Sequence, residues 1–305
     1  RFKKEDKKNQ RNYILQDQRF NIDILFYPRV NDEDIKKFLS VLFVAFNLGN
    51  FGARSRRGFG SILIEKIEGD LPNNFNLKFT PEIPIDKWLL SQLDYIRNLN
   101  FWKPRKDIPY IFDNNFQIYK INKENISKYK EWVKEVQEGR RGNYLKKEWG
   151  LEDIKNQIDL LDYMGFLLMA FRSYRNPDYQ SAKNILKNQD NNNLNNNLIE
   201  FQRISFGLPI NFFFSSLRNS GELFLKKDNQ KFRRASPLIF KILEINNSDF
   251  PFEALFIILL SKFMPDNSKL YFKNKEIKFS QKDSFQLLKN FIQSLQKYEI
   301  INKIK

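Results

Sequence analysis

The 305-residue sequence contains neither cysteine nor histidine. Without cysteine, the chain has no disulfides, no thiol nucleophile and no cysteine-based zinc site, which fits a reducing cytoplasmic location. Without histidine, it has no histidine general base, no histidine metal ligand and no Ser-His-Asp triad. Any catalysis would have to use carboxylates, lysine or tyrosine. We expect no enzyme activity, no metal and no other cofactor.

Long apolar runs are also missing. No uninterrupted apolar stretch reaches the roughly 18 residues that a membrane-spanning helix needs. No signal peptide is visible at the start of the chain, so we expect no membrane partner. The sequence begins at Arg1 rather than at a methionine, and we therefore expect further sequence upstream.

Positive charge is what the chain has in excess. Lysine and arginine together number 52 against 36 aspartates and glutamates, which gives a net charge of +16 at pH 7. A surplus of this size favours a polyanionic partner, with nucleic acid first. An AT-rich genome inflates lysine and asparagine but not arginine. Clusters of arginine are therefore the better indicator of function.

The most distinctive stretch is a glycine- and arginine-rich segment, residues 48–61. It holds the glycines and arginines Gly49, Gly52, Arg54, Arg56, Arg57, Gly58 and Gly60. It lacks the Gly-Lys-Ser/Thr of a P-loop, and its helix-loop-strand order is the reverse of a dinucleotide-binding fingerprint. Glycines let main-chain N–H groups approach an oxyanion, and guanidinium forks suit phosphate. The segment thus predicts a phosphate-binding loop; a plain helix-to-strand turn is the alternative.

The sequence around this loop predicts a strand, a helix and a second strand. Alternating apolar residues predict a strand at 20–27. An apolar stripe at helical spacing behind Asn31, a good N-cap residue, predicts a helix at 32–47. Residues rich in β-branched side chains predict a strand at 59–67, after the loop.

Farther along, helical and strand patterns alternate irregularly. Helices are predicted at 86–98, 124–137, about 151–171 and 281–298. Strands are predicted at 203–209 and 211–214, a turn at 219–221, an apolar run from 238 to 245 and a hairpin at 271–279. Residues 187–198 are an asparagine-rich loop, and 252–263 fit a helix or a strand. Because strands and helices follow no regular βα repeat, the predicted class is α+β.

Further arginines occur in clusters outside the loop. They are Arg140 and Arg141 between two glycines, Arg172 and Arg175 around Tyr174, Arg203, and the pair Arg233 and Arg234. Taken singly, each cluster fits a solvated surface. Taken together with the loop, they predict a channel for a polyanion.

At these residues the sequence resembles a known family. Segment 48–61, with its Gly-Ala-Arg-Ser-Arg-Arg-Gly-Phe-Gly-Ser core, is similar to the glycine-rich loop of the RAMP superfamily of CRISPR proteins. Together with 206–209 and 233–238, it resembles more narrowly the first RAMP subunit of the Cmr (type III-B) effector complex. Residues 171–179 lie where that family also carries basic side chains. The resemblance spans most of residues 20–272.

The resemblance implies a fold of two ferredoxin-like (RRM-like) domains. Residues 1–85 would be the second half of the first domain and include the loop 48–61, with the other half upstream of Arg1. Residues 86–305 would form a helical connector and the second ferredoxin-like domain.

The resemblance also implies a function. The chain would be a non-catalytic, cytoplasmic RNA-binding subunit of a CRISPR ribonucleoprotein complex in antiviral defence. Its partners would be guide RNA, target RNA or both, and other RAMP subunits of the Cmr complex. The alternative is a metal-independent RAMP endoribonuclease that processes guide RNA precursors, with lysine or tyrosine replacing the usual histidine.

The candidate RNA-binding residues combine the loop with the other arginine clusters. They are Gly52, Arg54, Ser55, Arg56, Arg57, Gly58, Arg140, Arg141, Arg172, Arg175, Arg203, Arg233 and Arg234. Phe51 and Phe59 are either base-stacking or core residues.

Overall fold

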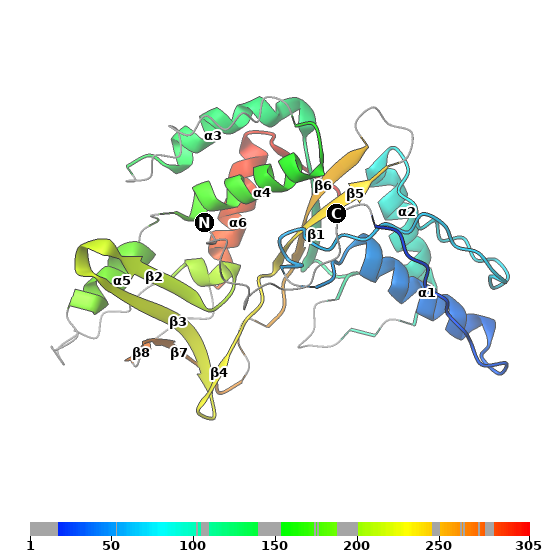
Figure 1. Ribbon diagram of the computed structural model, residues 1–305, viewed down its shortest axis with the longest axis horizontal. Coiled ribbons are helices and arrows are strands. Elements are labelled where there is room, and N and C mark those ends of the chain that lie inside the picture. Colours follow the sequence, from blue (N-terminus) through cyan, green and yellow to red (C-terminus); the bar gives the residue numbers. More distant parts are fainter. Residues whose placement is uncertain are drawn as a thin grey trace.

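The chain has a mixed α+β fold, as predicted (Figure 1). The computed structural model describes residues 18–52, 54–101, 103–104, 110–139, 154–173, 175, 177–187, 201–245, 251–262, 264, 266–273, 275–277 and 284–305. Within these residues, six α-helices accompany two antiparallel sheets. No helix in this part of the chain is both long enough and apolar enough to cross a bilayer.

Four strands form a sheet that we call the central sheet. They are β1 (Phe116–Ile121), β5 (Leu238–Glu244), β6 (Phe252–Leu259) and β9 (Ile301–Lys303). Their order is β5-β6-β1-β9, and all neighbours are antiparallel. Within the described residues, the chain forms three α-helices and three strands of a second sheet between β1 and β5, and two more strands of that sheet and one α-helix between β6 and β9. Strand β5 lies at one edge of the central sheet.

Three helices cover one face of the central sheet (Figure 1). They are α3 (Tyr129–Val136), α4 (Gln157–Arg172) and α6 (Gln286–Lys297). A capping box between Asn156 and Asp159 fixes the start of α4. Trp132, Phe256 and Phe291 are fully buried between these helices and the sheet.

Two helices cover the opposite face. They are α1 (Asp32–Asn47) and α2 (Ile85–Asn98). Asn31 caps α1 by accepting a 2.9 Å hydrogen bond from the Asp34 N–H, as its sequence predicts. Phe43 and Leu89 pack against Ile118 and Ile257 of the sheet. The central sheet is therefore buried on both faces.

A second sheet, which we call the side sheet, lies at the lower left of Figure 1. Its strands are β2 (Ile210–Phe214), β3 (Asn219–Lys227), β7 (Lys269–Phe272) and β8 (Lys275–Ile277), in this order, with β4 (Gln230–Phe232) paired to β3. Helix α5 (Asp178–Lys187) packs on it over a separate apolar core that contains Phe212 and Phe272.

Most predicted helices and several strands are present. Helices 32–47 and 86–98 are confirmed as α1 and α2, and the described parts of 151–171 and 281–298 contain α4 and α6. The predicted helix 124–137 is divided into the 3₁₀ helix η2 (Lys123–Lys128) and α3. The hairpin near 271–279 is β7 and β8, and the ambiguous segment 252–263 contains β6. Most of the asparagine-rich loop, residues 188–198, lies outside the described residues.

The predicted strands at 20–27 and 59–67 are wrong. Neither segment pairs with another strand. Phe20, Ile22 and Leu25 are exposed, so the alternation seen in the sequence does not separate a buried from a solvated face. In the second segment, Ile64 and Ile67 pack against the α1–α2 core as irregular chain.

The prediction for 203–221 was also partly wrong. Residues 203–206, expected as strand, form the 3₁₀ helix η4 (Arg203–Phe206). The turn expected at 219–221 lies earlier, at residues 215–218, where the 3₁₀ helix η5 (Ser215–Leu217) ends at Arg218 with φ 45°. Asn219 already belongs to β3, so a residue typical of turns begins the strand that follows this turn.

Candidate anion-binding site

The glycine–arginine loop, residues 48–61, is fixed on the edge strand of the central sheet. The Asn50 side-chain amide donates to the carbonyl oxygens of Ser55 (2.6 Å) and Phe240 (2.7 Å). The Phe240 N–H donates to the Arg56 carbonyl at 3.3 Å, and Arg57 forms a parallel bridge with Phe240. Since unpaired strand edges attract other chains, the loop both covers β5 and gains a fixed position.

Two glycines make this close packing possible. Gly60 has φ 75°, and a Cβ there would lie 1.9 Å from the Phe51 carbonyl oxygen. The Phe51 N–H closes the loop by donating to Gly60 O at 2.9 Å. Gly58 has φ 83°, and a Cβ there would lie 2.1 Å from Leu161 Cδ2 of α4. A side chain at Gly60 would therefore overlap the main chain of the loop, and one at Gly58 would require Leu161 to move.

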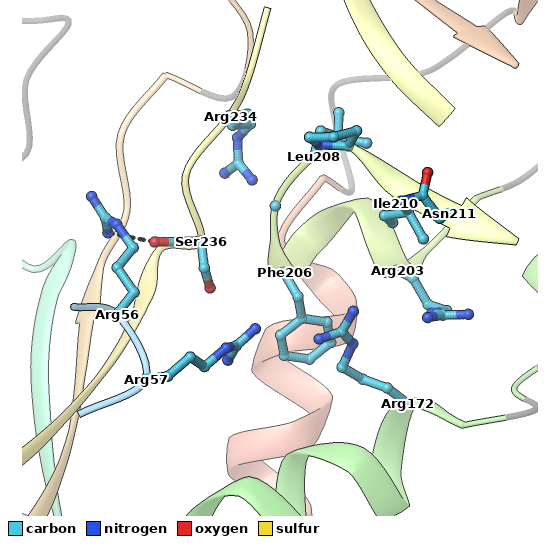
Figure 2. Close-up of a pocket in the computed structure, with 12 residues that line it drawn as sticks. Arg56, Arg57, Arg172, Arg203, Phe206, Leu208, Ile210, Asn211, Arg234 and Ser236 are labelled. Carbon is cyan, nitrogen blue, oxygen red and sulfur yellow. Dashed lines mark hydrogen bonds between the residues drawn. The ribbon is translucent and has the colours of Figure 1, made fainter. Parts of the chain in front are cut away.

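Beside the loop lies a cavity of about 390 Å³ that collects five arginines (Figure 2). They come from four separate segments: the loop, the last residue of α4, the first residue of η4 and the chain before β5. No carboxylate occurs among the described residues that line the cavity. These residues are Arg56, Arg57, Arg172, Arg203, Phe206, Gly207, Leu208, Pro209, Ile210, Asn211, Arg234 and Ser236.

Aromatic rings and carbonyl groups hold these arginines in place. Arg56 donates from Nη1 to the Ser236 carbonyl, and Arg234 donates from Nη1 to the Ile204 carbonyl at 3.3 Å. Four guanidinium carbons lie over aromatic rings, an arrangement that stabilises cations. The distances to the ring centroids are 5.4 Å for Arg57 over Phe240, 5.2 Å for Arg172 over Phe206, 5.2 Å for Arg203 over Phe212 and 5.0 Å for Arg234 over Phe285.

The cations disturb one another's protonation. Burial, followed by the positive charges of Arg203 and Arg57, lowers the pKa of Arg172 to about 9. Burial and the charge of Arg56 lower the pKa of Arg234 to about 10. Both guanidinium groups remain charged at pH 7, because each pKa is still well above that value. The five arginines thus form two groups whose charges act on one another: Arg57, Arg172 and Arg203 in one, and Arg56 and Arg234 in the other.

Some buried N–H groups in this cluster lack an acceptor. Arg57 Nη1 and Arg172 Nε are shielded from solvent and make no hydrogen bond within the described part of the chain. Leaving a buried charged donor without an acceptor costs at least about 1–3 kcal/mol. An anion in the cavity would supply the acceptor and also offset the mutual repulsion of the arginines.

Asp178 positions one wall of the cavity. This fully buried carboxylate accepts hydrogen bonds from the backbone N–H groups of Gln202 (2.8 Å) and Arg203 (2.9 Å). Burial raises the pKa of Asp178, while these hydrogen bonds and the Arg203 charge oppose the increase. The carboxylate therefore anchors the start of η4, from which Arg203 extends.

The structure brings together five of the predicted site residues at the cavity. Arg56, Arg57, Arg172, Arg203 and Arg234 line the cavity. The remaining described candidates do not line it: Gly52, Ser55 and Gly58 belong to the loop, Arg54 and Arg233 are exposed, and Arg175 lies 4.6 Å from the Phe171 ring centroid. Arg140 and Arg141 lie outside the described residues.

Two main-chain N–H groups of the loop bond within the loop itself. The Arg57 N–H donates to Arg54 O at 2.8 Å and the Phe51 N–H to Gly60 O, so these groups close the loop itself. The loop contributes the side chains of Arg56 and Arg57 to the cavity. Phe51 and Phe59 are 42% and 52% exposed and are not core residues.

Sequence reasoning missed one cation that supports the site. Lys241, in the middle of β5, is fully buried and donates from Nζ to the carbonyls of Phe46 (2.6 Å) and Gly49 (3.0 Å). Burial lowers its pKa to about 7. A single lysine inside the apolar run 238–245 is the signal in the sequence that could have identified it. Lys241 joins β5 to the end of α1 and to the first glycine of the loop.

No family model, curated protein or solved structure matches this chain. Among the described residues, no group of acidic side chains is arranged to hold a metal ion. The chemistry that the cavity offers is the binding of an anion by guanidinium groups.

Proposed function

We propose that the chain binds RNA through phosphate groups at the five-arginine cavity. The observation that carries the proposal is the convergence of arginines from four segments on one cavity, with no carboxylate among its described lining residues. Arginine forks match phosphate oxygens in geometry and charge. The net charge of +16 supports the same partner, because a polyanion is drawn to such a surface.

We further propose that the chain acts as a non-catalytic subunit of a type III-B CRISPR complex in the cytoplasm. This step depends on the resemblance to RAMP proteins. Its support is spatial: the segments that carry the resemblance, 48–61, 171–179, 206–209 and 233–238, each contribute to the lining of the same cavity. Motifs far apart in the sequence thus meet at one site.

The topology supports the ferredoxin-like part of the proposal for residues 86–305. If the side sheet, α3 and α5 are treated as insertions, the order β1, α4, β5, β6, α6, β9 and the sheet order β5-β6-β1-β9 follow the βαββαβ pattern. The proposal of a half-domain at 1–85 has less support. Its helix is present, but segments 20–27 and 59–67 are not strands.

Salt dependence tests whether phosphates are the bound groups. For single strands, the logarithm of the binding constant falls with the logarithm of salt at about −0.7 per phosphate contact. Five contacts predict a slope of about −3.5, measured by fluorescence anisotropy with a labelled single-stranded RNA. A slope near zero would contradict a phosphate-dominated interface.

Two double variants with equal loss of charge test whether the cavity is the site. Arg57→Gln with Arg172→Gln removes two cavity cations, whereas Arg54→Gln with Arg233→Gln removes two exposed cations outside it. A charged hydrogen bond contributes about 1.5–3 kcal/mol, so the first variant should lose about a hundredfold or more in RNA affinity. Equal losses in both variants would show that only overall charge matters.

Purification from the native cells tests membership of the complex. A tagged chain should co-purify with a small RNA and with other RAMP subunits. Recovery of the chain without either would contradict the proposed assembly. Specific cleavage of repeat RNA by the purified chain in the absence of metal would contradict the non-catalytic role and favour the nuclease alternative.

A further inference from the structure

We infer that the part of the cavity lined by Arg57, Arg172 and Arg203 is a subsite for a terminal phosphate monoester of an RNA strand. The inference rests on the proposed RNA binding and makes it more specific. The shared chemistry is a phosphate that ends the chain, at the 5′ or the 3′ end. The experiment below separates these two sources.

The arrangement of charge is the first argument. An internal phosphodiester carries one negative charge, and successive diesters are spread along the strand, so they are matched by a stripe of separate cations. Here the guanidinium groups of Arg57 and Arg203 are close enough to Arg172 for their charges to lower its pKa. A monoester carries a charge of about −1.5 to −2 and three acceptor oxygens. It therefore matches a group of three neighbouring guanidinium charges better than a diester does.

The second argument concerns the unsatisfied donors. Arg57 Nη1 and Arg172 Nε are buried and have no acceptor within the described residues. The two arginines come from the loop and from the end of α4, and their guanidinium ends both turn toward Phe206 in Figure 2. One phosphate with three free oxygens would accept from both side chains at once. A diester has only two free oxygens to share among the three arginines.

The walls of the cavity provide the third argument. Leu208 and Arg234 exchange backbone hydrogen bonds of 2.9 and 3.1 Å, so main chain forms a rigid wall. Gly207 has φ 110°, and a Cβ there would lie 3.0 Å from Arg234 O and from Ser236 N. The volume of about 390 Å³ lies near the lower limit of ligand pockets, about 300–1,000 Å³. The cavity therefore suits one end of a strand rather than several nucleotides.

The lining also predicts that binding does not depend on which base the terminal nucleotide carries. The Phe206 ring is 3% exposed, and Arg172 lies over it, so this ring offers no free face for stacking. Arg56 and Arg234, the other two arginines of the cavity, would lie beside the diester that follows the terminal phosphate. Recognition would then depend on the end of the strand and not on its sequence.

The test compares RNA ends on the unmodified protein. Three versions of one short single-stranded RNA are used: hydroxyls at both ends, a 5′-monophosphate, or a 3′-monophosphate. At about 150 mM salt, one phosphorylated version should bind at least tenfold more tightly than the hydroxyl version, and this version identifies the end. Equal or weaker binding of both phosphorylated RNAs overturns the subsite but leaves RNA binding intact. Absence of binding to all three overturns the proposed function as well.

Single-residue variants test which arginine causes the preference for a phosphorylated end. Arg172→Gln should weaken the binding of both RNAs, but it should weaken the phosphorylated RNA about tenfold more than the hydroxyl-ended RNA, so that the advantage disappears. Arg234→Gln should weaken the binding of phosphorylated and hydroxyl-ended RNA by equal factors, and Arg233→Gln, an exposed neighbour, should change neither. An advantage that survives Arg172→Gln in a folded protein overturns the assignment. The comparison of ends needs no variant and remains decisive if a variant fails to fold.

Discussion

Lys241 is a fully buried cation in an apolar strand. Its two carbonyl acceptors, Phe46 O and Gly49 O, lie at the end of α1 and the start of the loop. Carbonyls at a helix C-terminus carry partial negative charge, which favours a cation there. Burial has the opposite effect and lowers the pKa from 10.5 to about 7. Lys241 therefore joins β5, α1 and the loop, but burying its protonated form costs folding free energy.

The pKa of Lys241 predicts a pH-dependent stability. The unfolded chain has the ordinary value of 10.5 and binds more protons than the folded chain between about pH 7 and 10.5. The free energy of unfolding should therefore rise with pH across this window. Lys241→Met should flatten the rise by up to about 1.4 kcal/mol per pH unit. Urea unfolding of both proteins at pH 7.5–9.5 measures the difference, and identical slopes would contradict it.

Asp178 has a comparable role on the other side of the cavity. Its carboxylate accepts the N–H groups of Gln202 and Arg203, and an asparagine would place one of its own donors against one of them. Asp178→Asn should therefore cost about 1–3 kcal/mol of folding free energy. It should also weaken RNA binding, because Arg203 loses its fixed position.

Chemical denaturation and fluorescence anisotropy measure the two effects of Asp178→Asn. Asp228→Asn, an exposed carboxylate beyond β3, serves as the control and should leave both properties unchanged. Unchanged stability of the Asp178 variant would show that its two backbone hydrogen bonds do not determine the conformation of η4.

At the scale of elements, the loop is a closed turn whose two ends are joined by the bond from the Phe51 N–H to Gly60 O. Two of its glycines form a matched pair. Gly52 (φ 81°) and Gly60 (φ 75°) share a left-handed backbone, but a Cβ at Gly52 would have no neighbour within 4 Å, whereas one at Gly60 would meet Phe51 O. Substitutions at these positions therefore separate backbone strain from steric conflict.

Gly52→Ala should cost about 1–2 kcal/mol, the strain of a left-handed alanine. Gly60→Ala should cost about 1–3 kcal/mol more, because the new methyl group overlaps a backbone carbonyl. It should also lower RNA affinity by displacing Arg56 and Arg57. Thermal unfolding and anisotropy measure both effects. Equal destabilisation of the two variants would show that the loop relaxes freely.

Elements with a single buried face were predictable from the sequence. The apolar stripe of α1 follows from its position on one face of the central sheet, and its acidic first turn complements the helix dipole. β6 was ambiguous because it lies between β5 and β1 and is buried on both faces, so its apolar residues run continuously and also fit helical spacing. Segment 20–27 was wrongly predicted as a strand, because its apolar residues alternate but no partner strand pairs with it.

The arginine cavity was predictable only in part. Local composition singled out Arg56 and Arg57, and the arginine clusters near 172, 203 and 234 were visible as separate patches. Their convergence depends on how α4, η4 and the chain before β5 pack against the loop, and no sequence spacing encodes these distances. For the same reason Arg54 and Arg233, next to cavity residues in sequence, lie outside the cavity.

At the scale of the whole molecule, the central sheet is shared by two cores. Phe43 of α1 and Phe291 of α6 are both fully buried, on opposite faces of the sheet. Phe43→Ala and Phe291→Ala should each cost about 3–5 kcal/mol. Because both cores need the same strands, the two variants should lower the same calorimetric transition. Separate transitions for the two variants would show that the helical layers unfold independently.

The contact between Arg57 and β5 should limit how freely the sequence of the loop changes during evolution. The backbone of Arg57 shields the outermost strand, while its side chain belongs to the cavity. A substitution that displaces this backbone would expose an unpaired edge strand, which promotes aggregation, and would also weaken the cavity. Natural selection against aggregation would then act on the loop even where RNA is absent. Among homologous chains, residues 56–60 should accordingly vary more slowly than an exposed turn elsewhere on the surface.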